Sequence, residues 1–238
     1  VLQQGGFQTA GFVGGPFLEP QFGFARGFDV YRAGGSRLFT ETAPQAVQWI
    51  RDHADAPFFV FLHGNDVHPP FNLPRDGASI RHVFDKDYDG PADRLLMDYY
   101  FVKVFNRYQF SETELPPEPS YQEQVDRIRA TPSDVEHIVA HYDGQIFAVD
   151  EALESVFRVL EETGLEQQTI VVFTSDHGLE MAEKDKLCTG YHGTVWETIN
   201  WVPLVVWHPD LDPGSIEEVV ELVDLAPTLL GFAGLPVP

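Results

Sequence analysis

The stretch Thr169-Ile-Val-Val-Phe-Thr-Ser-Asp-His-Gly178 joins a short apolar run to a polar turn. Its first five residues are apolar, aromatic or β-branched, as in a buried strand, and Asp176 and His177 follow where that strand would end. Two more segments have this form, at residues 58–62 and 203–207. Apolar strands without alternation indicate a sheet that is covered on both faces, as parallel sheets are. The sequence therefore predicts a mostly parallel, mixed sheet.

Helical patterns separate these strands. The clearest begins at Ser133-Asp-Val-Glu136, which has the form of a capping box, and continues with apolar residues at helical spacing to a stop at Gly164. Shorter helices are predicted from about Pro44 to His53 and from Leu225 to Gly231. Strands that alternate with helices favour the α/β class, with a sheet flanked by helices.

The charge of the chain excludes several classes of partner. Among its 238 residues, 15 are Lys or Arg and 37 are Asp or Glu, which gives a formal net charge of −22 at pH 7. A surface of that sign repels polyphosphates, so neither nucleic acid nor a membrane surface is expected as a partner. No apolar run reaches the roughly 18 residues of a membrane span. The single cysteine, Cys188, can form neither an internal disulfide nor a cysteine-based zinc site.

Residues 76–131 differ from the rest of the chain. They contain an aromatic stretch at residues 99–110 and a proline cluster at residues 116–119. We predict an insertion with one helical piece, packed over the active-site side of the sheet, where substrate specificity usually resides. Residues 1–238 as a whole are predicted to form a single, partial α/β domain.

Polar residues near the ends of the predicted strands are candidates for a functional site. In open parallel sheets, ligands bind outside the carboxyl ends of the strands. His68 follows the strand at residues 58–62, the pair Asp176-His177 follows the strand that starts at Thr169, and His192 precedes the third strand. A carboxylate and an imidazole that are adjacent in a bending chain can bind one cation. These residues therefore form the candidate site.

Each candidate also has a plainer interpretation. Asp-His-Gly is an ordinary turn sequence, and on the tripeptide alone a turn and a functional site are equally favoured. His63 is interpreted as a solvated or hydrogen-bonded histidine rather than a ligand. Glu180, Glu183 and Asp185 are interpreted as a solvated acidic loop, in keeping with the charge of the chain.

The order of short motifs along the chain resembles the sulfatases, a family of the alkaline-phosphatase-like superfamily. The segment from Ile170 to Gly178 resembles the family's late strand and metal-ligand turn, and His192-Gly193 with Trp196-Glu197 resembles the segment that follows it. Further resemblances lie at residues 6–10, 23–29, 59–71, 142–150 and 222–236. Together these motifs cover nearly the whole chain except the predicted insertion. The resemblance implies an incomplete alkaline-phosphatase-like α/β core.

The resemblance also implies roles for individual residues. Asp176 and His177 match two of the four protein ligands of a divalent metal, which is usually calcium. Because imidazole suits manganese or zinc better than calcium, these two ions remain alternatives. His68 matches a histidine that contacts the sulfate or protonates the leaving oxygen. His192 stands where many members have a lysine that contacts the sulfate. The implied activity is metal-dependent hydrolysis of a small-molecule or saccharide sulfate ester.

Two parts of the family's pattern are absent from these residues. The sequence Cys/Ser-x-Pro-x-Arg, whose first residue becomes the formylglycine nucleophile, does not occur, and no Asp-Asp pair supplies the other metal ligands. We expect the chain to lack the N-terminal nucleophile region and the C-terminal subdomain, and to be inactive by itself. Two alternatives stay open for the intact protein. One is a phosphonate monoester or phosphodiester hydrolase of the same superfamily, and the other is a non-catalytic relative that only binds a ligand.

Overall fold

The computed structural model describes residues 1–34, 38–69, 71, 84–85, 87–95, 130–183 and 195–237. The chain divides into two compact units, each built from separate stretches of sequence. The first unit comprises Val1–Asp66, Val149–Asp176 and Pro203–Pro238, and the second comprises Val67–Ala148 and His177–Val202. The helix α5 (Pro132–Glu162) contributes residues to both units.

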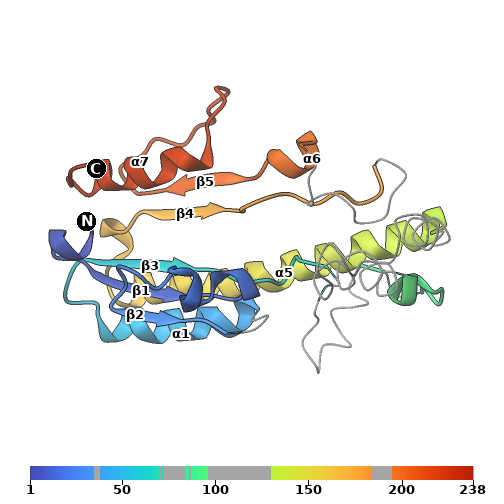
Figure 1. Ribbon diagram of the computed structural model, residues 1–238, viewed down its shortest axis with the longest axis horizontal. Coiled ribbons are helices and arrows are strands. Elements are labelled where there is room, and N and C mark those ends of the chain that lie inside the picture. The colour runs from blue at the N-terminus through green and yellow to red at the C-terminus, as the bar shows by residue number, and fades with distance from the viewer. Residues whose placement is uncertain are drawn as a thin grey trace, which may run out of the picture. The chain divides into compact units, whose positions relative to one another are not determined.

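A parallel sheet lies in the first unit (Figure 1). Its strands are β1 (Gln8–Phe12), β2 (Val30–Arg32) and β3 (Phe58–Leu62), in the order β2-β1-β3. In this register Ala10 of the central strand is paired with Val30 on one side and with Val60 on the other. The predicted strand at residues 58–62 is confirmed.

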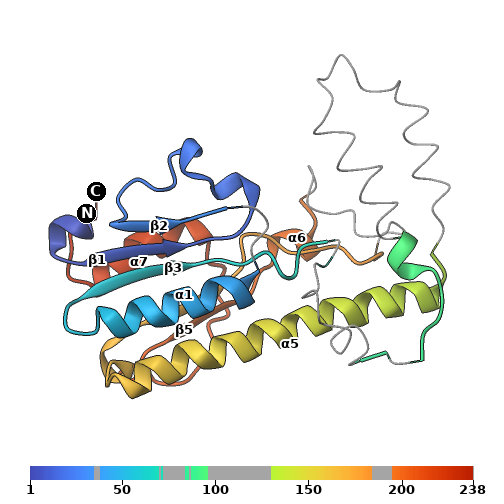
Figure 2. The ribbon, with the colours of Figure 1, turned by 90° about the horizontal axis from the view of Figure 1, so that it is seen from below.

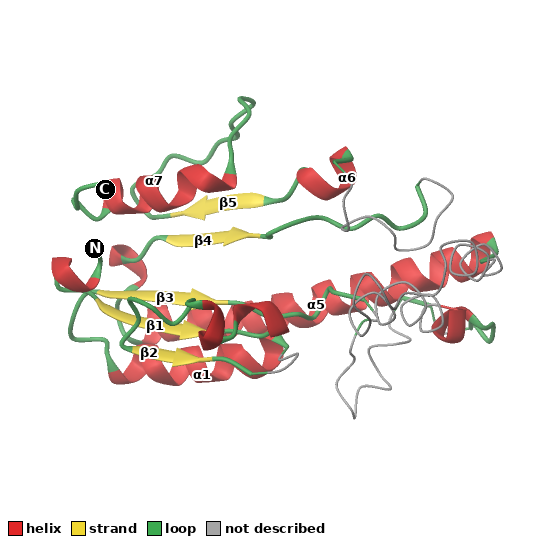
Figure 3. Cartoon of the chain, viewed as in Figure 1, coloured by secondary structure: helices red, strands yellow, loops and turns green. Residues whose placement is uncertain are grey.

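The other two strands of the first unit form an antiparallel pair (Figure 3). They are β4 (Val171–Thr174) and β5 (Leu204–Trp207), each slightly shorter than predicted. An α/β fold with parallel and antiparallel strands and flanking helices is therefore confirmed. The expected coverage of both strand faces is not met in this pair, because Phe173 and Val205 are 39% and 57% exposed.

Helices and the parallel sheet enclose the core of the first unit. The helix α1 (Phe39–Asp52) runs alongside β1 and β3 (Figure 2). The buried core consists of residues of β1, α1 and the second half of α5, namely Ala10, Phe12, Ala46, Trp49, Ile50, Val159 and Leu160. Removing this much apolar surface from water is the main source of stability in such a core.

The helix α1 begins five residues before the predicted start at Pro44. Leu38 precedes its first residue, and the backbone N–H of Leu38 donates to Glu41 Oε2 over 3.0 Å. The backbone N–H of Phe39 donates to the carboxylate of Asp66, which lies in the loop after β3. Glu41 of the helix itself and Asp66 from a distant loop therefore complete the helix start, because the N-cap residue Leu38 has no polar side chain. Pro44 lies inside the helix.

The predicted long helix is confirmed as α5, but its capping box lies two residues earlier. The helix starts at Pro132, a residue that suits a first helical position because its missing N–H needs no partner there. The side chain of Asp134 accepts hydrogen bonds from the N–H and hydroxyl of Thr131 (2.7 and 2.8 Å), and the N–H of Asp134 donates to Thr131 Oγ1 (3.2 Å). This reciprocal pair replaces the predicted Ser133 and Glu136.

Short elements complete the described chain. The predicted helix near the end is confirmed as α7 (Leu225–Phe232), and α6 (Glu197–Asn200) precedes β5. The 3₁₀ helices are η1 (Gln3–Gly5), η2 (Pro16–Leu18), η3 (Pro20–Phe22), η5 (Glu166–Gln168) and η6 (Leu222–Asp224). Among the helices that the structure describes, none is both long and apolar enough to cross a membrane.

The second unit has a smaller core around the first half of α5. Phe71, Ala92 and Ile138 are its buried apolar residues. Of the predicted insertion at residues 76–131, the structure describes only residues 84–85, 87–95 and 130–131, and residues 92–95 are helical. The remainder of that predicted insertion lies outside the described residues.

Candidate functional site

Two strands of the first unit end in loops that contain aspartate and histidine. β4 is followed by Asp176 and His177, and β3 is followed by His63 and Asp66. Both loops lie at the carboxyl end of a strand, which is the usual position of ligand-binding residues in α/β sheets. The two loops hold these residues in different environments.

Asp66, after β3, is a structural residue. Its side chain is only 2% exposed, and its carboxylate accepts the backbone N–H of Phe39 at the start of α1. Burial raises the pKa of Asp66, while the N–H groups of the helix start oppose that rise. A carboxylate at a helix N-terminus also interacts favourably with the helix dipole. Asp66 therefore joins α1 to the loop after β3.

His63 is bound into the first unit through its backbone. Its N–H donates to the carbonyl oxygen of Phe12 (3.0 Å), and its own carbonyl oxygen accepts the N–H of Gly14 (3.1 Å). The ring nitrogen Nδ1 is buried and forms no hydrogen bond with the described residues. At Nδ1 the side chain of His63 is therefore neither solvated nor hydrogen-bonded to the described residues, which differs from its interpretation as a solvated or hydrogen-bonded histidine.

In the loop after β4, the side chains of Asp176 and His177 are more exposed than that of Asp66. Asp176 is exposed to solvent and His177 is half-buried. Nδ1 of His177 lies 2.8 Å from the carbonyl oxygen of Gly178. Since a carbonyl oxygen can only accept, Nδ1 carries the proton, and Nε2 is the ring nitrogen with the lone pair. A carboxylate and an imidazole nitrogen with a lone pair thus follow one another in the sequence.

Gly178 allows the turn after His177 to pack against another backbone segment of the second unit. A Cβ atom on Gly178 would lie 2.0 Å from the carbonyl oxygen of Thr198. The N–H of Gly178 donates to the carbonyl oxygen of Ile199 over 2.7 Å, which fixes this approach. Any side chain at position 178 would therefore push the turn away from the segment that contains α6.

The remaining predicted site residues are placed as follows. His68 is half-buried in the second unit, and its Nδ1 lies 2.5 Å from the carbonyl oxygen of Pro69. His177 belongs to the same unit as His68, whereas Asp176 belongs to the first unit. His192 lies outside the described residues. The convergence of these four residues on one site stays a prediction.

One interpretation of the acidic loop was wrong. Glu180 is buried, with 2% of its surface exposed, rather than solvated. Glu180 is buried because its neighbours Leu179 and Met181 pack against the core of the second unit. The spacing of the acidic residues in the sequence does not reveal that contact. Asp185 lies outside the described residues.

The donor chemistry of Asp176 and His177 fits part of a divalent metal site. The carboxylate suits calcium, and the imidazole nitrogen suits manganese or zinc. Two donors are fewer than the roughly six to eight oxygen ligands of calcium or the roughly four ligands of zinc. The pair would therefore hold a cation together with further ligands.

A second group of histidine and aspartate residues was missed in the sequence. Asp93, His137 and His141 offer three potential metal-ligating atoms in the second unit, all within 4.8 Å of one another. The spacing of His137 and His141 on a predicted helix was a visible signal, because residues four apart lie on one helical face. Asp93 is far away in the sequence and gave no such signal.

The fold is shared with several solved structures. A phosphonate monoester hydrolase from Silicibacter pomeroyi is similar over the whole chain with a TM-score of 0.68 and 20% identity, covering 57% of that structure. The protein BT4656, solved with its substrate D-glucosamine-2-N,6-O-disulfate, matches over the whole chain with a TM-score of 0.64 and 21% identity, covering 60% of that structure. These likenesses show the alkaline-phosphatase-like fold.

The family follows from the sequence comparison. The profile of the Sulfatase family matches residues 5–235, so the chain belongs to the sulfatase family. Arylsulfatase K from Bos taurus is 28% identical over 205 residues, and the alkaline phosphatase superfamily protein PehA from Trinickia caryophylli is 28% identical over 221 residues. The matches cover 82% and 85% of this chain but only 36% and 38% of those proteins. The chain thus spans just over a third of the length of these relatives.

Proposed function

We propose that the intact protein hydrolyses sulfate esters of small molecules or saccharides in a metal-dependent reaction. The observation that carries this proposal is the turn Asp176-His177-Gly178, in which the Nδ1 bond to Gly178 leaves Nε2 of His177 as the ligating nitrogen. The turn lies within the residues that match the sulfatase family. A relative named arylsulfatase K and a neighbour bound to a disulfated glucosamine support the substrate class.

The proposed roles follow the chemistry of each side chain. Asp176 and His177 would hold a divalent cation, calcium by preference and manganese or zinc as alternatives. A bound cation would neutralise the sulfate oxygens and lower the pKa of the nucleophile. His192 would donate a hydrogen bond to the sulfate, and His68 would either contact the sulfate or protonate the leaving oxygen.

These roles also answer an electrostatic requirement. The chain has a formal net charge of −22, which opposes the approach of an anionic ester. A site that binds sulfate therefore needs a local excess of positive charge. A cation held by Asp176 and His177, together with two histidine donors, would supply that charge within an acidic protein.

The nucleophile is proposed to be a formylglycine outside these 238 residues. Cys188 does not begin the sequence Cys-x-Pro-x-Arg that is converted to formylglycine, and no serine in the chain begins the equivalent pattern. The 238-residue chain alone is therefore expected to show no turnover. Mass spectrometry of the intact protein would identify a formylglycine from the mass of its peptide.

A second candidate is hydrolysis of phosphonate monoesters or phosphodiesters. The imidazole of His177 favours this alternative, because it suits manganese or zinc better than calcium. The likeness to a phosphonate monoester hydrolase shows the shared fold only, since the identity is 20%.

The test is to compare kcat/KM of the intact, purified protein for 4-nitrophenyl sulfate and for 4-nitrophenyl phenylphosphonate. Sulfatase function predicts a higher kcat/KM for the sulfate. A higher kcat/KM for the phosphonate would overturn it in favour of the second candidate. Turnover of neither, in a protein loaded with metal, would overturn both and favour a non-catalytic relative.

A further inference from the structure

Two histidines on one face of α5 are buried side by side in the second unit. His137 and His141 are 3% and 4% exposed, and their ring centroids are 4.5 Å apart. Residues four apart on a helix lie one turn above one another, so both rings leave α5 in the same direction. Two protonated imidazoles at this distance would repel one another, whereas two neutral ones can share a cation.

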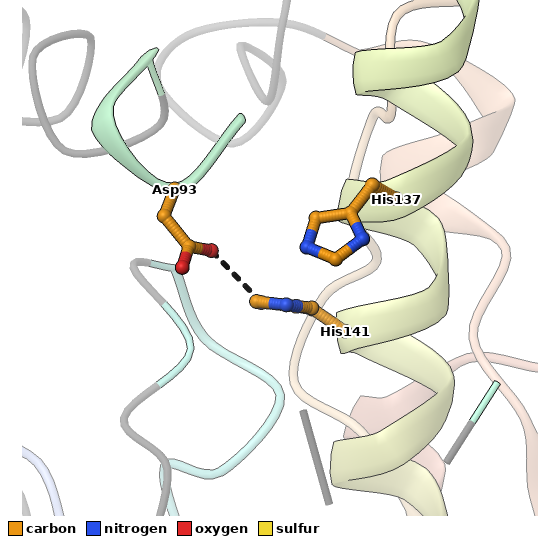
Figure 4. Close-up of side chains that lie close together, drawn as sticks. All are labelled: Asp93, His137 and His141. Carbon is orange, nitrogen blue, oxygen red and sulfur yellow. Dashed lines mark ion pairs between the residues drawn. The ribbon is translucent and has the colours of Figure 1, made fainter. Parts of the chain in front are cut away.

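Asp93 provides a third donor. It lies in the helical turn at residues 92–95, and its Oδ1 is 3.5 Å from Nδ1 of His141. Figure 4 shows its carboxylate directed toward His141, with the ring of His137 beside them. In a tetrahedral site with metal–ligand bonds of about 2.0–2.2 Å, donor atoms are about 3.3–3.6 Å apart. The separation of Asp93 and His141 therefore suits a metal between them.

Asp85 orients the ring of His137. Its Oδ2 lies 2.9 Å from Nδ1 of His137. A carboxylate at Nδ1 fixes the proton there and leaves the lone pair on Nε2, as in many metal sites where a carboxylate supports a ligating histidine. His137 is therefore arranged as a ligand through Nε2.

Tyr88 contacts both the turn that contains Asp93 and the helix that contains His137 and His141. Its ring stacks on that of His137, with centroids 3.9 Å apart and an interplanar angle of 18°. Its hydroxyl oxygen accepts the backbone N–H of Ala92, next to Asp93, over 2.8 Å, and its O–H donates to Asp134 on α5. The turn with Asp93 and the helix with the two histidines are thus held by the same side chain.

We propose that Asp93, His137 and His141 bind a divalent transition-metal cation, with zinc as the best fit. Two imidazole nitrogens and one carboxylate oxygen are common zinc ligands, whereas calcium prefers oxygen ligands alone. Three protein ligands leave a fourth position for water or another donor. The cation would link the helical turn at residues 92–95 to α5. The site uses none of the residues proposed for sulfate hydrolysis.

The test is calorimetric titration of the chelator-treated intact protein with zinc, supported by the visible absorption of bound cobalt. We expect one zinc at this site, retained when His177 is changed to Gln, and a tetrahedral cobalt spectrum. Asp93→Asn and His141→Gln should each weaken zinc binding by at least about 10-fold, and Asp85→Asn by roughly 10-fold. Because Asp93 is half exposed, Asp93→Asn should preserve the fold, which circular dichroism would verify.

Two control variants separate this site from others. His208 also has a carboxylate neighbour, because its Nδ1 lies 3.8 Å from Asp210 Oδ2. Among the described residues it belongs to no group of three potential metal ligands, so His208→Gln should bind zinc like the wild type. His177→Gln should also retain zinc binding. The proposal fails if the wild-type chain binds no zinc at micromolar concentration. It also fails if folded Asp93→Asn binds zinc as tightly as the wild type, or if His177→Gln removes the binding.

Discussion

The loops after β3 and β4 contain the same kinds of residue but use them differently. Asp66, after β3, is buried and accepts a hydrogen bond from the start of α1. Asp176, after β4, is exposed and is followed by a histidine whose Nδ1 is bonded to a carbonyl oxygen. An aspartate at a strand end is therefore not evidence of a site by itself. Burial and hydrogen-bond partners distinguish a structural carboxylate from a candidate ligand.

The largest effect is expected from Asp176→Asn in the intact protein. Removing the charge that compensates the proposed cation should lower kcat/KM for an aryl sulfate by at least about 100-fold. Unfolding by urea should be nearly unchanged, because the side chain is exposed. Activity close to that of the wild type would show that the metal turn is assigned wrongly.

The matching change after β3 should affect stability rather than chemistry. Asp66→Ala leaves the backbone N–H of Phe39 without its acceptor, which should lower the free energy of unfolding by about 1–3 kcal/mol. Asp66→Asn keeps an acceptor oxygen and should cost less. Equal stability of the alanine variant and the wild type in urea unfolding would contradict the capping role.

The pH dependence of stability should have opposite signs for two aspartates. Burial raises the pKa of Asp66, so its contribution is present below the unfolded pKa of about 4 and is lost as the pH rises through the folded value. Hydrogen bonds from the N–H and hydroxyl of Thr9 lower the pKa of Asp29. Its contribution is present above about pH 4 and is lost as the pH falls.

Urea unfolding between pH 3.5 and 7 would measure both effects. Relative to the wild type, Asp66→Asn should gain stability as the pH rises across this range. Asp29→Asn should be less stable than the wild type at pH 7, and that difference should shrink toward acid pH. Parallel pH profiles for the two variants would contradict the assignment of either carboxylate.

The smallest effect is expected in β5, where the strand is exposed. Val205 is 57% exposed, so Val205→Thr should change the free energy of unfolding by no more than about 0.5 kcal/mol. Phe12→Ala at the fully buried C-terminal end of β1 should cost about 3–5 kcal/mol in the same assay. Similar costs at both positions would mean that β4 and β5 are covered in solution.

Much of the fold could be predicted because it depends on local patterns. The apolar runs at residues 58–62, 169–173 and 203–207 mark the strands β3, β4 and β5, although the bounds of β4 and β5 differ by one or two residues. The periodic segment before Gly164 is a long helix. Helix starts were less predictable. Asp66 caps α1 from 27 residues away, and such a tertiary contact leaves no pattern in the sequence.

The candidate site was predictable only in part. The turn at Asp176 and His177 is a contiguous motif, so its residues could be proposed as a site from the sequence, and their role stays a prediction. The role of Gly178 could not be predicted, because it depends on the carbonyl oxygen of Thr198, which lies 2.0 Å from where a Cβ atom at position 178 would be. The group of Asp93, His137 and His141 also depends on a tertiary contact, although the two histidines share a visible helical spacing.

The most direct test of the central claim compares the same substitution after the two strands. Calcium affinity of the intact, chelator-treated protein would be measured by calorimetry for the wild type, Asp176→Asn and Asp66→Asn, with manganese as a second probe. We predict that Asp176→Asn loses most of its affinity and that Asp66→Asn binds like the wild type. Wild-type affinity in Asp176→Asn, or loss of affinity in a folded Asp66→Asn protein, would contradict the placement of the metal after β4.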